Sequence, residues 1–213
     1  MSLRLYFLRH GETIYSQSGG YCGEIDPELT PEGHQMAQDF AEAYKDFPWQ
    51  SIYVSPKKRT IATAKPLCEA IGVEMQIREG LREIAYGKWE GKSAEEVRDQ
   101  FPEDYVRWLT EPAWNPPTGG GETSVEIASR AMAVIAEIKQ NHADGNVLIV
   151  SHKATIRIIL CSLLGIDIGR YRDRIDCLAA SISMVKMDIH GPLLQILGDR
   201  THMSDELRDR PGS

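Results

Sequence analysis

Two arginines, two histidines and one glutamate of this sequence follow short apolar runs. Two guanidinium groups beside an imidazole suit a tetrahedral oxyanion such as phosphate, because each planar group donates paired hydrogen bonds and keeps its charge at any working pH. Their positive field also lowers the pKa of a neighbouring histidine, which leaves a ring nitrogen free to attack. The set therefore indicates a phosphate site with a histidine nucleophile. Its members are Arg9, His10, Arg59, Glu83 and His152.

These side chains suffice to write a reaction. Attack of His10 on phosphorus would form a phosphorylated histidine, and Glu83 could give a proton to the leaving alkoxide. The sequence contains no complete P-loop motif with its magnesium-binding hydroxyl. We therefore expect no metal and no cofactor, with the arginines and His152 stabilising the charge that develops on the phosphoryl group.

Each of these residues alone has an ordinary structural explanation. An Arg-His pair is common on surfaces, and Arg59 alone fits a solvated helix. Glu83 alone fits an exposed partner of Arg82, and His152 alone fits a helix cap. The functional interpretation depends on whether the fold gathers them.

The elements that could gather them are four short β-rich segments. We expect strands at 4–8, 51–55, 74–77 and 146–151, the last almost entirely apolar, as in a strand covered by helices on both faces. In open α/β sheets, ligands bind beyond the carboxyl ends of the strands. Each candidate residue follows one of these ends, so the sequence predicts that they share one edge of a sheet.

Helical segments alternate with these strands. We expect helices at 31–47, 56–70 and 153–164, and two more that begin at capping boxes, Ser93 with Glu96 and Thr123 with Glu126. Two strand-like runs, 181–187 and 193–197, follow. The alternation predicts an α/β fold with three layers, α/β/α, and a mostly parallel central sheet. The helix after Thr123 should bury one face, made of Val125, Ala128, Met132, Ile135 and Ile138.

Composition narrows the function classes. The 213 residues suit one domain, which we expect to carry a small helical cap at 85–118 and a flexible tail at 201–213. A net charge of -7 disfavours general nucleic-acid binding, and no apolar stretch is long enough for a membrane span. Without a secretion signal at the N-terminus, we expect a cytoplasmic protein. The four cysteines form no C-x-x-C pair, and the remaining histidines show no metal-binding spacing.

Five ordered segments resemble the signatures of the histidine phosphatase superfamily, which has the phosphoglycerate mutase-like fold. They span roughly residues 3–165, and their order makes the match specific. The resemblance implies that His10 is the phosphate-accepting nucleophile, Glu83 the proton donor, and Arg9, Arg59 and His152 the rest of the phosphate pocket. It also implies that no metal is needed. The segments are LRHGET (8–13), YVSPKKRTIATA (53–64), LREIAYGKWEG (81–91), GGGETSVEIASRA (119–131) and VLIVSHKATIRIIL (147–160).

Three departures from the pattern bear on the substrate. Ser16 stands where relatives often have a phosphate-binding asparagine, and it can still donate a hydrogen bond. The loop that reads R-[YF]-Q-G in relatives is GYCG here, with Cys22 and Gly23, and Lys153 replaces the usual glycine after the second histidine. We therefore count Ser16, Cys22, Gly23 and Lys153 as substrate-binding candidates, together with Arg9, Arg59 and His152.

The cap separates hydrolysis from phosphoryl transfer to a second substrate. Residues 85–118 carry four cationic and seven acidic side chains, a poor balance for retaining a bisphosphate. The short form of the segment after Glu83 resembles the phosphatase branch, which includes α-ribazole phosphatase and broad-specificity phosphatases. We predict a phosphomonoesterase for a small-molecule phosphate ester. The alternatives are a cofactor-dependent phosphoglycerate mutase and a catalytically inactive phosphate-binding module; a homodimer through an open sheet edge is compatible with all three.

Overall fold

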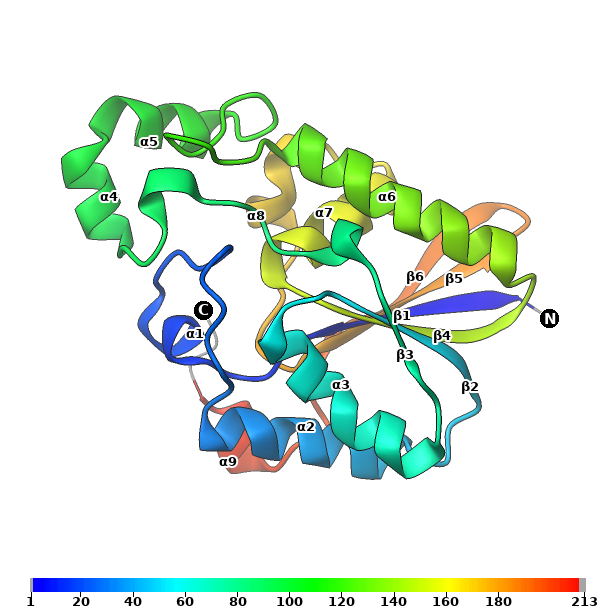
Figure 1. Ribbon diagram of the computed structural model, residues 1–213. Helices are drawn as coiled ribbons and strands as arrows, with labels where there is room; N and C mark the ends of the chain where they lie inside the picture. The colour runs from blue at the N-terminus through cyan, green and yellow to red at the C-terminus, as the bar shows by residue number, and fades with distance from the viewer. Residues whose placement is uncertain (1, 211–213) are drawn as a thin grey trace.

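The computed structural model describes residues 2–210. Its strands form one mixed sheet with helices around it (Figure 1). Its strand order is β3-β2-β4-β1-β5-β6. The first four strands of this order are parallel, and β5 and β6 run antiparallel to their neighbours. The predicted α/β fold with a mostly parallel sheet is therefore confirmed. The strands are β1 (Leu3–Arg9), β2 (Trp49–Val54), β3 (Met75–Ile77), β4 (Gly145–Ser151), β5 (Ile182–Asp188) and β6 (Gly191–Asp199).

Helices cover both faces of the sheet, as the three-layer prediction requires. In Figure 1, α2 and α3 lie on one face, and α6 and α7 lie on the other. Short helices complete the two outer layers and the loops. The longer helices are α2 (Pro31–Tyr44), α3 (Lys58–Ile71), α6 (Ser124–Asn141) and α7 (Lys153–Leu164). The shorter ones are α1 (Ile14–Ser18), η1 (Glu79–Leu81), η3 (Ile168–Arg170), α8 (Tyr171–Arg174) and α9 (Asp205–Arg208).

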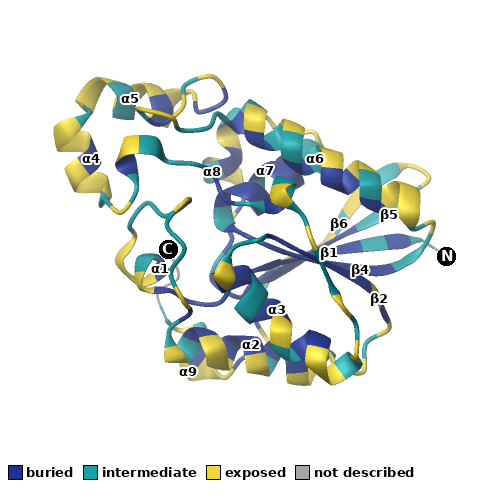
Figure 2. Cartoon of the chain, in the orientation of Figure 1, coloured by how far each residue is buried: buried dark blue, intermediate teal, exposed yellow. Residues whose placement is uncertain are grey.

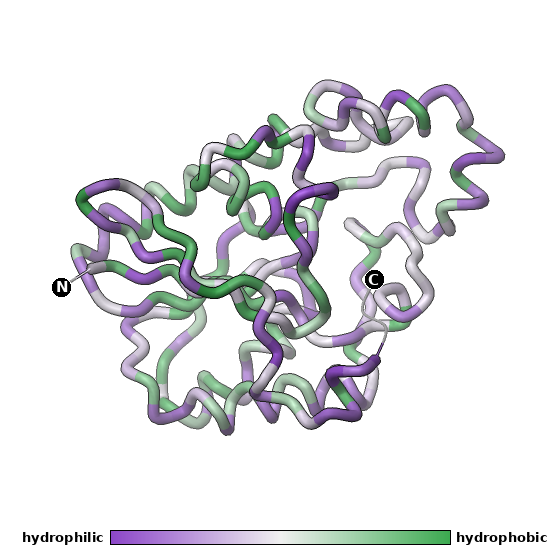
Figure 3. Tube along the Cα trace, turned by 180° about the vertical axis from the view of Figure 1, so that it is seen from behind, coloured by the Kyte–Doolittle hydropathy of each residue, from purple (hydrophilic) through white to green (hydrophobic). Residues whose placement is uncertain are grey.

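The central strands β1 and β4 are buried on both sides because their alternate residues feed two separate cores. Leu5 and Phe7 pack under α6 and α7, whereas Tyr6 and Leu8 pack with Phe40 on the opposite face. This arrangement explains why the middle of β4, from Val147 to Val150, is apolar at every position and fully buried (Figure 2). Seen from behind, hydrophobic residues are concentrated along the central strands (Figure 3).

Local signals in the sequence placed four of the five expected helix starts correctly. The helix expected from residue 56 begins instead at Lys58, and its N-cap, Lys57, makes no side-chain hydrogen bond. The predicted capping boxes form at Ser93 and at Thr123, where the Glu126 carboxylate accepts from the Thr123 backbone at 2.8 Å.

The buried face of α6 agrees with the expectation only in part, since Ile135 and Ile138 are buried as predicted. Its fully buried residues include Ile127, Ala131 and Val134, while the predicted Val125, Ala128 and Met132 are only partly buried. The helix is apolar around much of its circumference, so periodicity alone did not decide which stripe faces the sheet.

The predicted cap region contains a 3-10 turn, η2 (Gly87–Trp89), and two helices, α4 (Ala94–Gln100) and α5 (Pro102–Thr110). Figure 1 shows α4 and α5 beyond the carboxyl ends of the strands, away from the sheet. No helix within residues 2–210 is long and apolar enough to cross a membrane.

The predicted tail, 201–213, is helical in part of its described stretch. Met203 and Leu207 are buried beside Met36 and Ala179, and the Arg210 guanidinium donates to the Glu12 carboxylate at 2.9 and 3.0 Å. These two apolar residues, spaced among charges, were missed as a packing signal. Mobility of the segment stays a prediction.

Candidate active site

Backbone contacts fix the loop that carries His10 at the end of β1. The His10 N–H donates to the Ser151 carbonyl of β4 at 3.0 Å, and the Gly11 N–H donates to Thr63 Oγ1 at 2.9 Å. A Cβ atom on Gly11 would lie 2.5 Å from the Gly33 carbonyl oxygen, so only glycine fits this approach to α2. The strand end and α2 thus hold the loop from both sides.

The imidazole of His10 has one nitrogen available for chemistry. Its Nδ1 lies 2.7 Å from the Gly11 carbonyl oxygen, and because a carbonyl can only accept, Nδ1 carries the proton. Nε2 therefore holds a free lone pair. Burial, with Arg59 and Arg9 nearby, keeps the pKa of His10 well below its usual 6.5, so the ring is neutral at pH 7.

Two buried guanidinium groups accompany this ring. Arg9 donates from Nη1 to the Cys177 carbonyl at 2.8 Å. Arg59, only 1% exposed, donates from Nη1 to the Ile25 carbonyl at 2.9 Å and from Nη2 to the Gly23 carbonyl at 3.2 Å. Backbone carbonyls thus orient both cations, and the Asp26 carboxylate lies 3.5 Å from Arg59 Nη1 as a partly buried counterion. The field of the two arginines still lowers the pKa of His10.

His152 lies behind these groups and does not line the cavity. Its ring centroid is 5.2 Å from that of His10. Nδ1 accepts from Arg59 Nε at 3.2 Å, so Nε2 carries the proton and donates to Ser55 Oγ at 2.7 Å. Burial and Arg59 hold the pKa of His152 well below 6.5. In this structure a neutral His152 contacts and orients Arg59, and its direct contact with phosphate stays a prediction.

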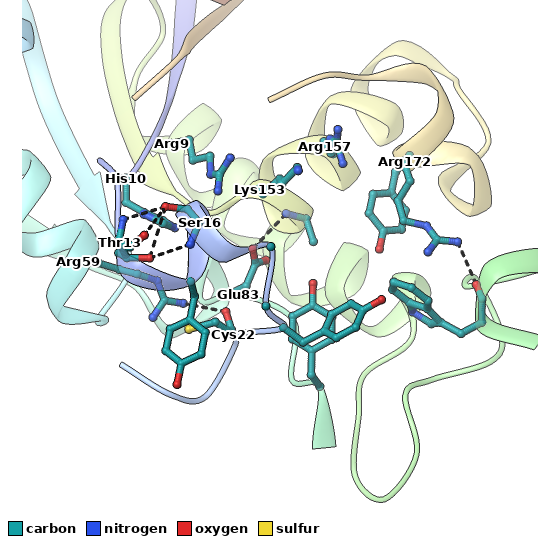
Figure 4. Close-up of a pocket in the computed structure, with 18 residues that line it drawn as sticks. Arg9, His10, Thr13, Ser16, Cys22, Arg59, Glu83, Lys153, Arg157 and Arg172 are labelled. Carbon is teal, nitrogen blue, oxygen red and sulfur yellow. Dashed lines mark hydrogen bonds between the residues drawn. The ribbon is translucent and has the colours of Figure 1, made fainter. Parts of the chain in front are cut away.

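Glu83 lies at the N-terminus of α7. Its carboxylate accepts from the Ala154 and Thr155 backbone N–H groups, each at 3.2 Å, and from its neighbour Ile84 at 3.0 Å. Arg130 supports the segment before it by donating to the Arg82 carbonyl at 2.7 Å. The carboxylate is therefore fixed where α7 begins, on the opposite side of the cavity from Arg59 (Figure 4).

The five gathered side chains border or back one cavity of about 200 Å³. Arg9, His10, Arg59 and Glu83 line it directly. The remaining lining is mostly aromatic or polar, and reaches from α1 to the cap and α8 (Figure 4). It consists of Thr13, Tyr15, Ser16, Gly19, Gly20, Tyr21, Cys22, Tyr86, Trp108, Lys153, Ala154, Arg157, Tyr171 and Arg172.

The departures from the family pattern fall in different places. Cys22 and Lys153 line the cavity, and burial raises the pKa of the Cys22 thiol to about 11. Ser16 lines it too, but its hydroxyl donates to the Thr13 carbonyl at 3.0 Å within the cap of α1. Gly23 is not among the lining residues. Its N–H donates to the Glu90 carboxylate at 3.1 Å, and a Cβ there would lie 1.8 Å from the Ile84 carbonyl oxygen.

Sequence reasoning missed two arginines of the cavity. Arg157 is four residues after Lys153 on α7, a helical spacing that could have revealed it. Arg172 comes from α8, and its guanidinium carbon lies 3.8 Å from the centroid of the Trp108 ring. No motif marks Arg172. The described residues contain no cluster of three His, Cys, Asp or Glu side chains suited to a metal.

Comparisons with known proteins found a matching family and named relatives. A family model described as histidine phosphatase superfamily (branch 1) matches residues 5–200. The chain is 31% identical over 203 residues to phosphoserine phosphatase 1 of Hydrogenobacter thermophilus, covering 95% of each chain. It is 29% identical over 175 residues to glucosyl-3-phosphoglycerate phosphatase of Mycolicibacterium vanbaalenii, covering 79% of this chain and 77% of that one.

A solved structure has the same fold. It is that of a putative α-ribazole-5'-P phosphatase from Escherichia coli str. K-12 substr. MG1655, which superposes with a TM-score of 0.84 at 24% identity. The match covers 94% of this chain and 98% of that one.

Proposed function

The chain belongs to the histidine phosphatase superfamily, and from this membership we propose that it is a phosphomonoesterase acting on a small phosphorylated metabolite through a phosphohistidine intermediate. One observation carries the proposal beyond the family. His10 is neutral, its Nε2 lone pair is free, and it lies in the field of two buried arginines. A nucleophile for phosphorus needs these properties.

In the proposed first step, His10 Nε2 attacks phosphorus. The Nε2–P bond forms while the bond from phosphorus to the ester oxygen breaks, and Glu83 in its protonated form gives its proton to the leaving oxygen. Arg9 and Arg59 bind the non-bridging oxygens and stabilise their charge. We assign the Arg59 contact to Nη2, because the contacts of this nitrogen with the loop carbonyls, at 3.2 and 3.4 Å, are the weaker ones.

The second step returns the enzyme to its starting state. The Glu83 carboxylate takes a proton from water, the water oxygen attacks phosphorus, and the Nε2–P bond breaks to release inorganic phosphate. Glu83 thus ends protonated, as it began. His152 acts as a positioning residue, since it touches Arg59 and not the cavity.

Hydrolysis is favoured over phosphoryl transfer by two observations. The relatives that match most of the chain are named phosphatases. In the cap helices, Arg98 and Arg107 are paired with neighbouring acidic side chains at 3.6 to 3.8 Å, which leaves little free positive charge there for a bisphosphate.

We further propose a cytoplasmic enzyme that does not act on nucleic acid, supported by the net charge of -7. A homodimer stays possible through the edge strand β6, where Leu193 and Leu197 are exposed. Light scattering would test that state.

Phosphate release in the presence of a chelator tests the function. The panel contains an aryl phosphate, phosphoserine, 3-phosphoglycerate and α-ribazole phosphate, and the variants are His10→Ala and a control, His34→Ala, on the exposed surface of α2. We expect turnover that is lost in the first variant and kept in the second. Release only after adding 2,3-bisphosphoglycerate would indicate the mutase. Binding of phosphate esters without any release would indicate the inactive module.

A further inference from the structure

The cavity carries more positive charge than one phosphate needs. Its lining residues include five guanidinium or ammonium groups but a single carboxylate, Glu83, in a protein whose net charge is -7. Two of the cations, Arg9 and Arg59, flank the nucleophile. A phosphate group is neutralised by those two, so the other three are left for another part of the substrate. They are Lys153, Arg157 and Arg172.

Arg172 is already engaged. Its Nη2 donates to the Trp108 and Leu109 carbonyls at 3.2 and 3.0 Å, and its guanidinium stacks on the Trp108 ring. This arginine joins α8 to the cap.

Lys153 has no such engagement. Within residues 2–210 its ammonium group makes no hydrogen bond and no ion pair, although the residue is half-buried. The charged and titratable groups around it are Arg9 on β1, Arg157 on α7, and Asp176 and Cys177 in the loop before β5. Burial and the two arginines lower the pKa of Lys153 to about 8. Burying an ammonium without a counterion costs free energy, which a bound anion would recover.

Arg157 is also poorly satisfied. Its Nε is buried and, in the described part of the chain, has no hydrogen-bond partner. Its one ion pair, from Nη2 to Asp176, is 3.4 Å long, and the side chain of Asp176 is 71% exposed. Such a pair is screened by solvent and holds the guanidinium weakly.

From this arrangement we propose that Lys153 and Arg157 form a second anion-binding subsite, which binds a carboxylate or a second phosphoryl group of the same substrate. The inference rests on the proposed function and names its substrate class, a short phosphate ester with a second negative charge. Residues four apart on α7 lie on one face of the helix, so both side chains can contact one anion. Figure 4 shows them beside Arg9, along the wall that leads away from His10.

The position of Glu83 supports this assignment. Its carboxylate is bound by the first turn of α7, so the leaving oxygen that it protonates must lie there. The alcohol part of the substrate then extends over the same helix, past Lys153 and Arg157. A cavity of about 200 Å³ leaves room for only a short spacer between the two anionic groups.

A matched pair of esters isolates the second charge. 3-Phosphoglycerate and glycerol 3-phosphate have the same carbon skeleton and differ in the carboxylate, and glycerol 1,3-bisphosphate presents a phosphoryl group in its place. We expect Lys153→Met to lower kcat/KM for 3-phosphoglycerate by about 10- to 100-fold, the usual effect of one charge-assisted hydrogen bond, and for glycerol 3-phosphate by less than about threefold. Lys153→Arg should restore most of the preference. Lys65→Met, which removes an exposed lysine of α3, is the control.

The pH dependence of this substrate preference gives an independent test of the subsite. In the wild type, kcat/KM for 3-phosphoglycerate relative to glycerol 3-phosphate should fall as the pH rises above about 8, where Lys153 loses its proton. The ratio should not change with pH in Lys153→Met. A preference for the bisphosphate over 3-phosphoglycerate would support the subsite and identify the second anion as phosphoryl; the reverse preference would support it and identify a carboxylate.

Two outcomes separate this proposal from the proposed function. If the wild type hydrolyses both esters equally, or if Lys153→Met keeps the preference, the subsite is wrong while the phosphatase stands. If the wild type hydrolyses no ester, the function is wrong, and calorimetry of 3-phosphoglycerate and glycerol 3-phosphate then decides the subsite. Tighter binding of 3-phosphoglycerate that Lys153→Met abolishes would support it, and equal binding would overturn it.

Discussion

The phosphate end of the cavity and its cap end are held together by different kinds of contact. At the phosphate end, Arg9, His10 and Arg59 are buried, and each side chain is oriented by a hydrogen bond to a backbone carbonyl. Hydrogen bonds are directional, so each reacting atom has one position. The chemistry is therefore set by the strand ends and the loops joined to them.

The cap end is built from rings. Trp89 and Trp108 meet edge to face at 5.3 Å, with Tyr21 and Tyr86 against them. Within residues 2–210, the buried indole nitrogens of both tryptophans have no hydrogen-bond partner. Such packing depends on shape more than direction, and cores of this kind tolerate exchange of similar volumes. We therefore expect substitutions in the cap to alter which substrate is bound, while the residues of the phosphate end stay the same.

Glu90 couples the two ends. Its carboxylate accepts from Gly23 and Ile25, in the loop whose carbonyls orient Arg59, and from Tyr86 at the base of the cap. A change in the cap can thus reach Arg59 through a single side chain.

The largest expected effect concerns the phosphate end. Glu83→Gln keeps the size and shape of the side chain but removes the proton donor and, because an amide nitrogen cannot accept, one of the two hydrogen bonds from α7. We expect kcat for alkyl phosphates to fall by about 10²- to 10⁴-fold, the usual contribution of general acid catalysis. An aryl phosphate with an acidic leaving group needs less protonation and should lose less. Equal losses for both esters in steady-state assays would contradict the role of Glu83.

Trp108→Leu tests the cap end. The change removes the ring under Arg172 and one wall of the cavity. We expect KM for the preferred ester to rise about tenfold and kcat to change less than about threefold, because the reacting groups keep their positions. A fall in kcat as large as that of Glu83→Gln would show that the two ends are not separable.

Arg210→Ala tests how the phosphate end is braced from the C-terminal segment. Glu12, fully buried two residues after His10, accepts from Arg210 Nε and Nη2 and from Thr30 Oγ1. Loss of Arg210 leaves the buried Glu12 carboxylate with fewer hydrogen-bond partners, so urea unfolding should show a lower free energy of unfolding. Arg210→Lys should recover part of the difference. Arg98→Ala, at an exposed ion pair in the cap, should cost less than about 0.5 kcal/mol. If Arg210→Ala and Arg98→Ala lowered the free energy of unfolding equally, the Arg210 contact would not brace the phosphate end.

The smallest expected effect concerns His202, a partly buried histidine that, unlike His10, does not line the cavity. Burial lowers the pKa of His202 to about 4, below its ordinary value in the unfolded chain. Between pH 6.5 and 4 the unfolded chain therefore binds a proton that the native state does not, so stability falls as the pH falls. His202→Leu should remove up to about 1 kcal/mol per pH unit of this loss. The slope is measured by urea unfolding at pH 7, 6 and 5. Activity at pH 7 should not change; an unchanged slope would contradict the assignment.

The sequence predicted those parts of the molecule that depend on neighbouring residues. Helix caps such as Thr123 with Glu126 are complete within four positions, and strand ends mark Arg9 and His10 directly. The rule that ligands bind at the carboxyl ends of parallel strands then brought Arg59 and Glu83 to the same cavity.

Contacts between distant segments could not be predicted. Arg210 lies 198 residues from Glu12, and Glu90 binds the loop at Gly23 across 67 residues. For the same reason, the sequence did not show the contacts of two substrate-binding candidates, that of His152 with Arg59 and that of Gly23 with Glu90. The burial of Met203 and Leu207 likewise became visible only with α2 beside them.

The two described ends of the chain lie at different distances from the active site. β1 begins at Leu3 and delivers Arg9 to the cavity about 20 Å further on, at roughly 3.3 Å per residue. Arg210, in contrast, touches the loop of the nucleophile through Glu12. An affinity tag or fusion partner attached ahead of β1 should leave turnover intact. A tag joined on the C-terminal side of Arg210 would follow this contact directly, so purified preparations for kinetics should carry the tag ahead of β1.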